Sequence, residues 1–160
     1  MQRRQFLSQS LALSLPLTAW SQLAHAHHGW SSFDQNRPIY LEGKAVRVAW
    51  KNPHAELDLE ITTGLKLPPD LAQRKLPAQT APVDASLLSK AILPKRQDRL
   101  WEIELAPLSR MQAWSVAEIK PGSNVAVVGF TFAEEKGQAI LRVEYLFADG
   151  KVYGLRSAPA

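Results

Sequence analysis

The sequence contains no cysteine, which excludes several kinds of site at once. Without a thiol the chain cannot form disulfides, thiolate zinc sites, iron–sulfur clusters or a cysteine nucleophile. Strong charge of one sign is also missing, because the formal net charge is only +4 over 160 residues. That balance does not predict nucleic acid as a partner. The length is that of one domain with a sizeable core.

The chain also lacks a long hydrophobic run, and its N-terminus is typical of an export signal instead. Arg3 and Arg4 open a twin-arginine pattern, residues 11–20 form a short, interrupted apolar run, and Ala24 and Ala26 are small residues with cleavage-site spacing. The run is too short to be a stable membrane anchor. We therefore predict a signal peptide at residues 1–26, cleaved after Ala26, and a periplasmic mature protein. The twin-arginine route is favoured, and the general secretory route stays open.

The remaining residues, 27–160, predict one mainly β domain. Alternating apolar and polar residues predict strands at 41–50, 57–61, 101–105, 125–130 and 141–147, with one short helix at 108–114. Five strands with a helix between the third and fourth is the order of an OB-type Greek-key barrel. The expected core residues are Val46, Val48, Leu57, Leu59, Ile103, Leu105, Val125, Val127, Leu141 and Val143.

The segment at about 64–99 interrupts this pattern. It is rich in proline, and its lysines and arginines outnumber its aspartates. We interpret it as a long, partly disordered insertion outside the barrel. It serves either as a solvated loop or as a docking arm for an acidic partner.

Histidine is scarce, and its placement gives the sharpest functional clue. Signal cleavage removes His25 and leaves His27 as the first residue, followed by His28; the one other histidine is His54, in an Asn-Pro-His turn. An α-amine and imidazoles are strong nitrogen donors, and nitrogen-only sites favour copper(II) over nickel or zinc. We predict a copper site made by His27, His28 and His54. The amine and imidazole of His27 would form one chelate ring; alternatively, the His27 amine, the His28 amide and the His28 imidazole bind together.

Two other classes of function compete with a metal site. The first is a metal-free accessory module that binds an exported protein partner through the barrel face or the insertion. The second is an enzyme, but the sequence has no nucleophile motif and no carboxylate pair that it brings together. We therefore predict a small binding protein without catalytic residues. We expect no nucleic-acid partner and no stable membrane anchor.

Several motifs resemble one family of small exported bacterial proteins of unknown function. The motifs are His27-His28-Gly29-Trp30, Asn52-Pro53-His54 and the helix-opening stretch at 105–111. Members of that family begin with a His-His pair just after the signal and carry an Asn-Pro-His turn. The resemblance covers most of the mature chain except 64–99, and it carries over His27, His28 and His54 as matched positions without implying an activity.

Overall fold

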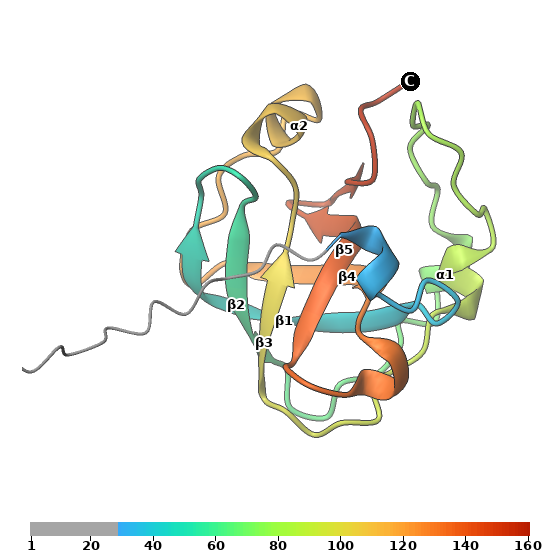
Figure 1. Ribbon diagram of the computed structural model, residues 1–160, viewed down its shortest axis with the longest axis vertical. Helices are drawn as coiled ribbons and strands as arrows, with labels where there is room; N and C mark the ends of the chain where they lie inside the picture. The colour runs from blue at the N-terminus through green and yellow to red at the C-terminus, as the bar shows by residue number, and fades with distance from the viewer. Residues whose placement is uncertain (1–28) are drawn as a thin grey trace, which may run out of the picture.

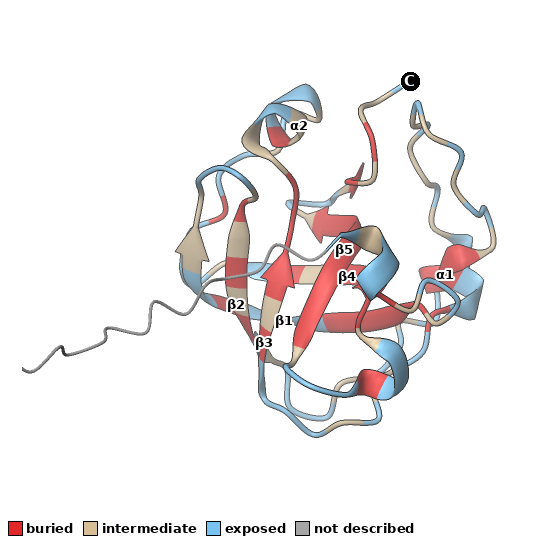
Figure 2. Cartoon of the chain, in the orientation of Figure 1, coloured by how far each residue is buried: buried red, intermediate tan, exposed pale blue. Residues whose placement is uncertain are grey.

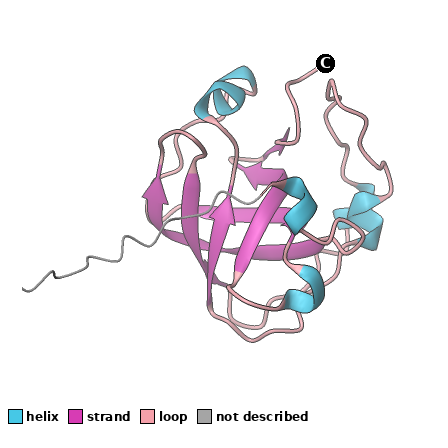
Figure 3. Ribbon diagram, in the orientation of Figure 1, coloured by secondary structure: helices cyan, strands magenta, loops and turns pink. Residues whose placement is uncertain are grey.

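The computed structural model describes residues 29–160, and the fold is mainly β (Figure 1). Short helices lie at the periphery of the sheet (Figure 3). The strands are β1 (Ile39–Ala49), β2 (Glu56–Ile61), β3 (Leu100–Glu104), β4 (Asn124–Phe130), β5 (Ile140–Ala148) and β6 (Lys151–Gly154). The helices are α1 (Leu87–Lys90) and α2 (Leu108–Ala113), with 3-10 turns η1 (Trp30–Ser32), η2 (Leu71–Gln73) and η3 (Ala133–Glu135). No helix within 29–160 is long and apolar enough to cross a membrane.

Five of the strands close into a barrel. Their order is β3-β2-β1-β4-β5, and a parallel pairing of β3 with β5 joins the two ends, with Ile103 opposite Leu141. The helix α2 lies between the third and fourth strands and covers one end of the barrel with Met111, which is buried in the barrel core. This confirms the predicted five-stranded barrel of OB-type order. The strand β6 extends the sheet beyond β5, where the sequence predicted only a tail.

The interior of the barrel is built by alternate residues of each strand. Leu57 and Leu59 of β2 and Ile103 of β3 are at most 1% exposed, because every second side chain of a strand points to the same face. Figure 2 shows the buried residues concentrated along the barrel strands. Eight of the ten predicted core residues are buried: Leu57, Leu59, Ile103, Leu105, Val125, Val127, Leu141 and Val143.

The prediction for Val46 is wrong, because a β-bulge reverses the side-chain alternation of β1. The pairing of β1 with β2 shifts between Ala45 and Arg47, and Val46 between them is 43% exposed. Ala45 is buried in its place, while Val48 packs against the core only in part. A bulge adds one residue to one strand, so every residue beyond it changes face.

A second irregularity divides β5 between two cores. Val128 and Gly129 of β4 are adjacent, yet they pair with Tyr145 and Val143, so no residue of β4 lies opposite Glu144. Beyond this point Leu146 belongs to the barrel core, whereas Tyr145 and Phe147 lie in a second core outside it. The regular alternation predicted through 141–147 therefore ends at Val143.

The insertion builds the second core, so the expectation of a solvated, partly disordered segment is wrong. Leu71, Leu87, Leu88 and Ala91 are buried against the outer face of the barrel. They pack with a group that comes from β1, β4, β5 and the η1 region: Phe33, Tyr40, Val128, Phe130, Ile140, Tyr145 and Phe147. The segment is outside the barrel, as predicted, but it is part of the packed structure.

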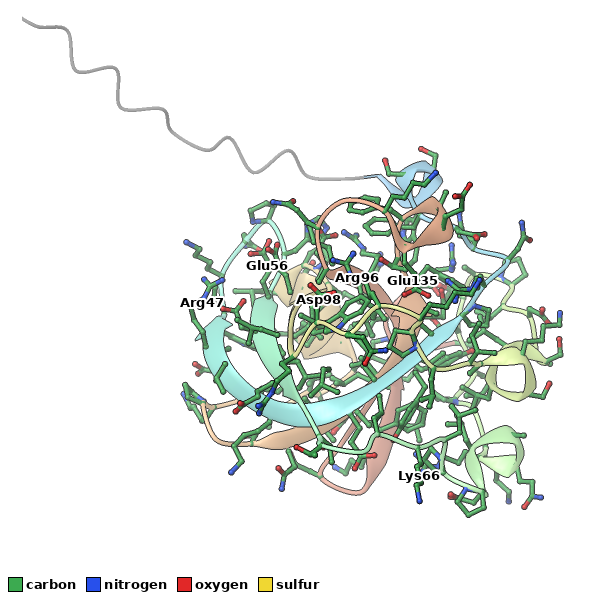
Figure 4. The ribbon with its side chains drawn as sticks, turned by 90° about the horizontal axis from the view of Figure 1, so that it is seen from below. Arg47, Glu56, Lys66, Arg96, Asp98 and Glu135 are labelled. Carbon is green, nitrogen blue, oxygen red and sulfur yellow. The ribbon has the colours of Figure 1, made fainter. Side chains whose placement is uncertain are left out.

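The insertion is hydrogen-bonded to other parts of the chain at its C-terminal end and in its middle. Near its C-terminal end, the N–H groups of Lys95 and Arg96 donate to the buried carboxylate of Glu135 in η3 at 2.9–3.0 Å. Figure 4, a view from below, shows Arg96 and Glu135 beside one another. In its middle, Gln79 accepts a hydrogen bond from the N–H of Ser157 at 3.1 Å, and the C-terminus lies at the tip of this loop (Figure 1).

Candidate functional site

Residues 29–38, which precede β1, lie across the outer face of β4 and β5, and we call them the strap. Phe33 is buried and its ring stacks on Phe132, with the centroids 5.1 Å apart. The N–H of Asp34 donates to the carbonyl of Thr131 at 2.9 Å. These contacts fix the direction in which the chain enters the described structure (blue in Figure 1). They also hold Trp30, in η1, against the barrel.

Trp30 packs on two arginines. The guanidinium carbon of Arg156 lies 3.9 Å from the centroid of the indole ring, and that of Arg142 lies 5.1 Å from it. The edge of the indole faces Phe130, with centroids 6.3 Å apart. Guanidinium groups are attracted to the face of an indole ring. Trp30 thus covers the guanidinium groups of Arg142, from β5, and Arg156, from the C-terminal segment.

Arg142 is a buried charge with a buried partner. It lies opposite Glu104 in the parallel pairing of β3 with β5, and its Nη1 donates to Glu104 Oε2 at 2.8 Å. Its Nη2 lies 3.1 Å from Nε2 of His54. Arginine has no acceptor, so Nε2 of His54 accepts this hydrogen bond. Arg142 therefore joins the indole of Trp30 to the imidazole of His54.

The second arginine has a buried carboxylate as its partner. Arg156 Nε donates to Oε2 of Glu144 at 2.7 Å, and Glu144 is fully buried. Burial raises the pKa of Glu144, although Arg156 opposes this shift. Arg156 Nη2 also donates to Gln35 in the strap at 3.0 Å. On the other side, α2 holds the backbone of this segment, because Arg110 donates to the carbonyls of Leu155 and Arg156.

The turn that carries His54 is docked onto the start of α2. Oδ1 of Asn52 accepts the N–H of Leu108 at 3.2 Å, which satisfies a donor that a helix N-terminus leaves unpaired. The N–H of Ala55 donates to the carbonyl of Ala106, and the carbonyl of Ala55 accepts the N–H of Leu105, both at 2.9 Å. The Asn52–Pro53 peptide bond is cis. The Asn-Pro-His turn and the helix-opening stretch at 105–111 are therefore one structural unit.

Of the three predicted metal ligands, the structure places His54, and His27 and His28 lie outside the described residues. His54 is half-buried beside Arg142. Within 29–160 no group of three histidine, aspartate or glutamate side chains could hold a metal ion. A metal bound at Nε2 of His54 would have to replace the guanidinium of Arg142.

The ion pairs of Arg142 with Glu104 and of Arg156 with Glu144 were not predicted from the sequence. Arg142 and Glu144 alternate with Leu141 and Val143, a pattern that predicts an outward, solvated face. The outward face is instead covered by the strap. One signal in the sequence is Trp30, an aromatic residue ahead of β1 that can cover charged side chains.

Comparison with known proteins finds a partial match to one family and no activity. The model of a family of unknown function, DUF6152, matches residues 15–65. The match includes η1, β1, the Asn-Pro-His turn and β2, and it is less than half of the chain. No curated protein matches the chain significantly, and no solved structure does.

Proposed function

We propose that this protein is an exported binding protein for one copper(II) ion. The ligands in this proposal are the α-amine and imidazole of His27, exposed by cleavage after Ala26, and the imidazole of His54. His28 adjusts the site or replaces one ligand. Such a set supplies only nitrogen donors, which favour copper among the divalent first-row metals.

The observation that carries the proposal is the contact chain from Trp30 through Arg142 to His54. The indole lies 5.1 Å from the guanidinium carbon of Arg142, whose Nη2 lies 3.1 Å from Nε2 of His54. His27 precedes Trp30 by three residues. A chain spans at most about 3.6 Å per residue, so chain length alone limits the distance between the Cα atoms of His27 and Trp30 to roughly 11 Å. This supports a meeting of the His-His pair with the distant Asn-Pro-His turn.

Arg142 sets a condition on metal binding at this place. Its guanidinium is hydrogen-bonded to Nε2 of His54, the nitrogen that a metal would need. The positive charge of Arg142 would also repel a metal ion bound there. Glu104 pairs with Arg142 through a different nitrogen, Nη1. In the proposed holo form Arg142 leaves His54 and keeps Glu104, so no buried charge loses its partner.

The decisive test is a titration of processed protein with copper(II), followed by electron paramagnetic resonance. The comparison form retains Ala26 before His27, which moves the amine out of the chelate ring. We expect the retained residue to weaken binding by more than roughly 100-fold, since it removes a ligand rather than only a supporting contact. Binding should also weaken as pH falls below about 6.5, because the ligating nitrogens must be neutral.

Two substitutions separate the ligands from their surroundings. His54→Ala should weaken copper binding, whereas Trp30→Phe keeps an aromatic ring on the arginines and should change it little. Intact mass of protein from the periplasm should show a chain that starts at His27. Equal affinity and identical spectra for the processed and extended forms would rule out the terminal chelate.

A further inference from the structure

The strand β6 has an unpaired outer edge at Val152. It pairs on one side with β5, where Val152 lies opposite Phe147. The N–H of Leu155 donates to the carbonyl of Glu144 at 2.8 Å. Because hydrogen-bonded and non-hydrogen-bonded pairs alternate in an antiparallel ladder, the N–H and C=O of Val152 point away from β5. Neither group has a hydrogen-bond partner within residues 29–160.

Two hollows lie beside this edge. The first, of about 440 Å³, is lined by Leu76, Pro77, Trp114 and Tyr153. The second, of about 590 Å³, lies over the turn between β5 and β6, and its lining includes Phe147 together with the charged residues Glu42, Arg74 and Asp149. Lys75, Lys151 and Val152 line both hollows. On the side of the first hollow, the free backbone groups of Val152 are thus flanked by apolar surface and by two lysines.

The charge of the first hollow has one sign. Lys75 and Lys151 are its only charged lining residues. Both are exposed, and neither forms an ion pair with another residue of 29–160. Arg74 nearby is engaged, since it pairs with Asp70 at 3.0 Å. The two lysines are therefore available for carboxylates from outside the chain.

We propose that this edge docks an extended acidic segment of a partner protein by strand addition. Two backbone hydrogen bonds to Val152 would orient the segment, its carboxylates would pair with Lys75 and Lys151, and an apolar side chain would enter the hollow at Trp114. Added strands gain affinity from backbone pairing and specificity from the side-chain pockets.

Two features limit what can occupy the edge. Gly154 is closed to a partner because the side chain of Gln79 lies against it, so only a short stretch can pair. A second copy of this chain would bring the Lys151 side chains of both copies to one small interface, and like charges there repel. An acidic partner segment avoids this repulsion, and it needs to pair only over the short stretch at Val152. This docking site is independent of the proposed copper site.

The probe for the test is the labelled peptide acetyl-Glu-Val-Glu-Val-Glu-Val-amide, and binding is measured with the processed protein by fluorescence anisotropy. We expect saturable binding that weakens with salt, because exposed charges are screened. Two control peptides should bind at least roughly tenfold more weakly. One replaces each glutamate with lysine; the other carries N-methyl groups at alternate peptide bonds, which block strand pairing.

Variants of the protein locate the site. Val152→Pro removes the outward N–H without removing a β5–β6 hydrogen bond, so it should abolish peptide binding. The double variant Lys75→Glu, Lys151→Glu changes only exposed side chains, keeps the fold, and should reverse the preference to the lysine peptide. Lys66→Glu, at an exposed lysine that lines neither hollow, should leave binding unchanged; Figure 4 shows this side chain pointing outward.

The proposal is overturned if the acidic peptide does not bind. It is also overturned if the double variant, shown to be folded by circular dichroism, binds the acidic peptide as well as the wild type does. Dimerisation through β6, lost in Val152→Pro, would assign the edge to a second copy and equally contradict it.

Discussion

At the scale of the residue, the carboxylate of Glu135 links η3 to the segment before β1 and to the end of the insertion. Its side chain is 2% exposed and accepts the N–H groups of Lys95 and Arg96 while pairing with Arg37. Burial alone raises the pKa of Glu135, but those N–H groups and the guanidinium outweigh it, so the pKa lies below its ordinary value of 4.5. The folded state therefore favours the charged carboxylate.

This direction predicts how Glu135→Gln changes with pH. The variant should lower the free energy of unfolding by about 2 kcal/mol at pH 7, because hydrogen bonds to a charged group are lost. A pKa that is lower in the folded state adds stability above the unfolded pKa, and that stability disappears as the pH falls through the folded pKa. Urea denaturation of both proteins should thus show a difference that shrinks below about pH 4.5. A difference that does not change with pH would contradict the assigned role.

At the scale of the element, β1 is shaped by a glycine. A Cβ at Gly43 would overlap the backbone carbonyl of Glu60 on β2. Glycine in a strand often marks such a close approach of another backbone. The approach lets β1 pair with β2 on one edge and with β4 on the other, which a strand shared by both sides of a closed barrel must do.

We expect Gly43→Ala to destabilise the barrel by about 1–3 kcal/mol, since either strand must move to make room. The control is Gly29→Ala, because a Cβ at Gly29 would meet only Oγ of Ser31 at 3.8 Å. Thermal unfolding followed by circular dichroism compares the two variants. Equal melting temperatures would show that the strands adjust without cost.

The sequence predicted the strands well where alternation is regular and poorly where it is interrupted. The clean alternation at 57–61 and 101–105 gave both the strands and their buried faces. The bulge at Val46 is invisible to such a pattern, because it depends on how β1 pairs with β2. His54 was found through its motif, whereas Arg142 was missed because its burial depends on Trp30, a residue remote in sequence.

At the scale of the whole molecule, the protein has two cores that share the barrel wall. The barrel interior forms one, and the insertion packs against the outside to form the other. The sequence did not predict the second core, because its apolar residues have no helical or strand period over 64–99. Leu71, Leu87 and Leu88 are buried by contacts with distant strands rather than by a local pattern.

Leucine substitutions measure what the second core contributes. Leu88 is 3% exposed, so Leu88→Ala should cost about 2–5 kcal/mol through lost burial and an unfilled cavity. Leu67, in the same insertion, is 39% exposed, and Leu67→Ala should change stability by less than about 0.5 kcal/mol. Chemical denaturation of both variants provides the comparison. Equal small effects would mean that the insertion is dispensable for stability.

The parallel pairing of β3 with β5 has a consequence for how fast the protein forms. The barrel cannot close until β5 is present, and α2 and β4 separate the two paired strands in the sequence. Domains dominated by pairings remote in sequence fold in milliseconds to seconds rather than microseconds. A chain that emerges N-terminus first therefore exposes its strand edges until residue 148 is available. We expect the newly emerged chain to depend on holding chaperones during that interval.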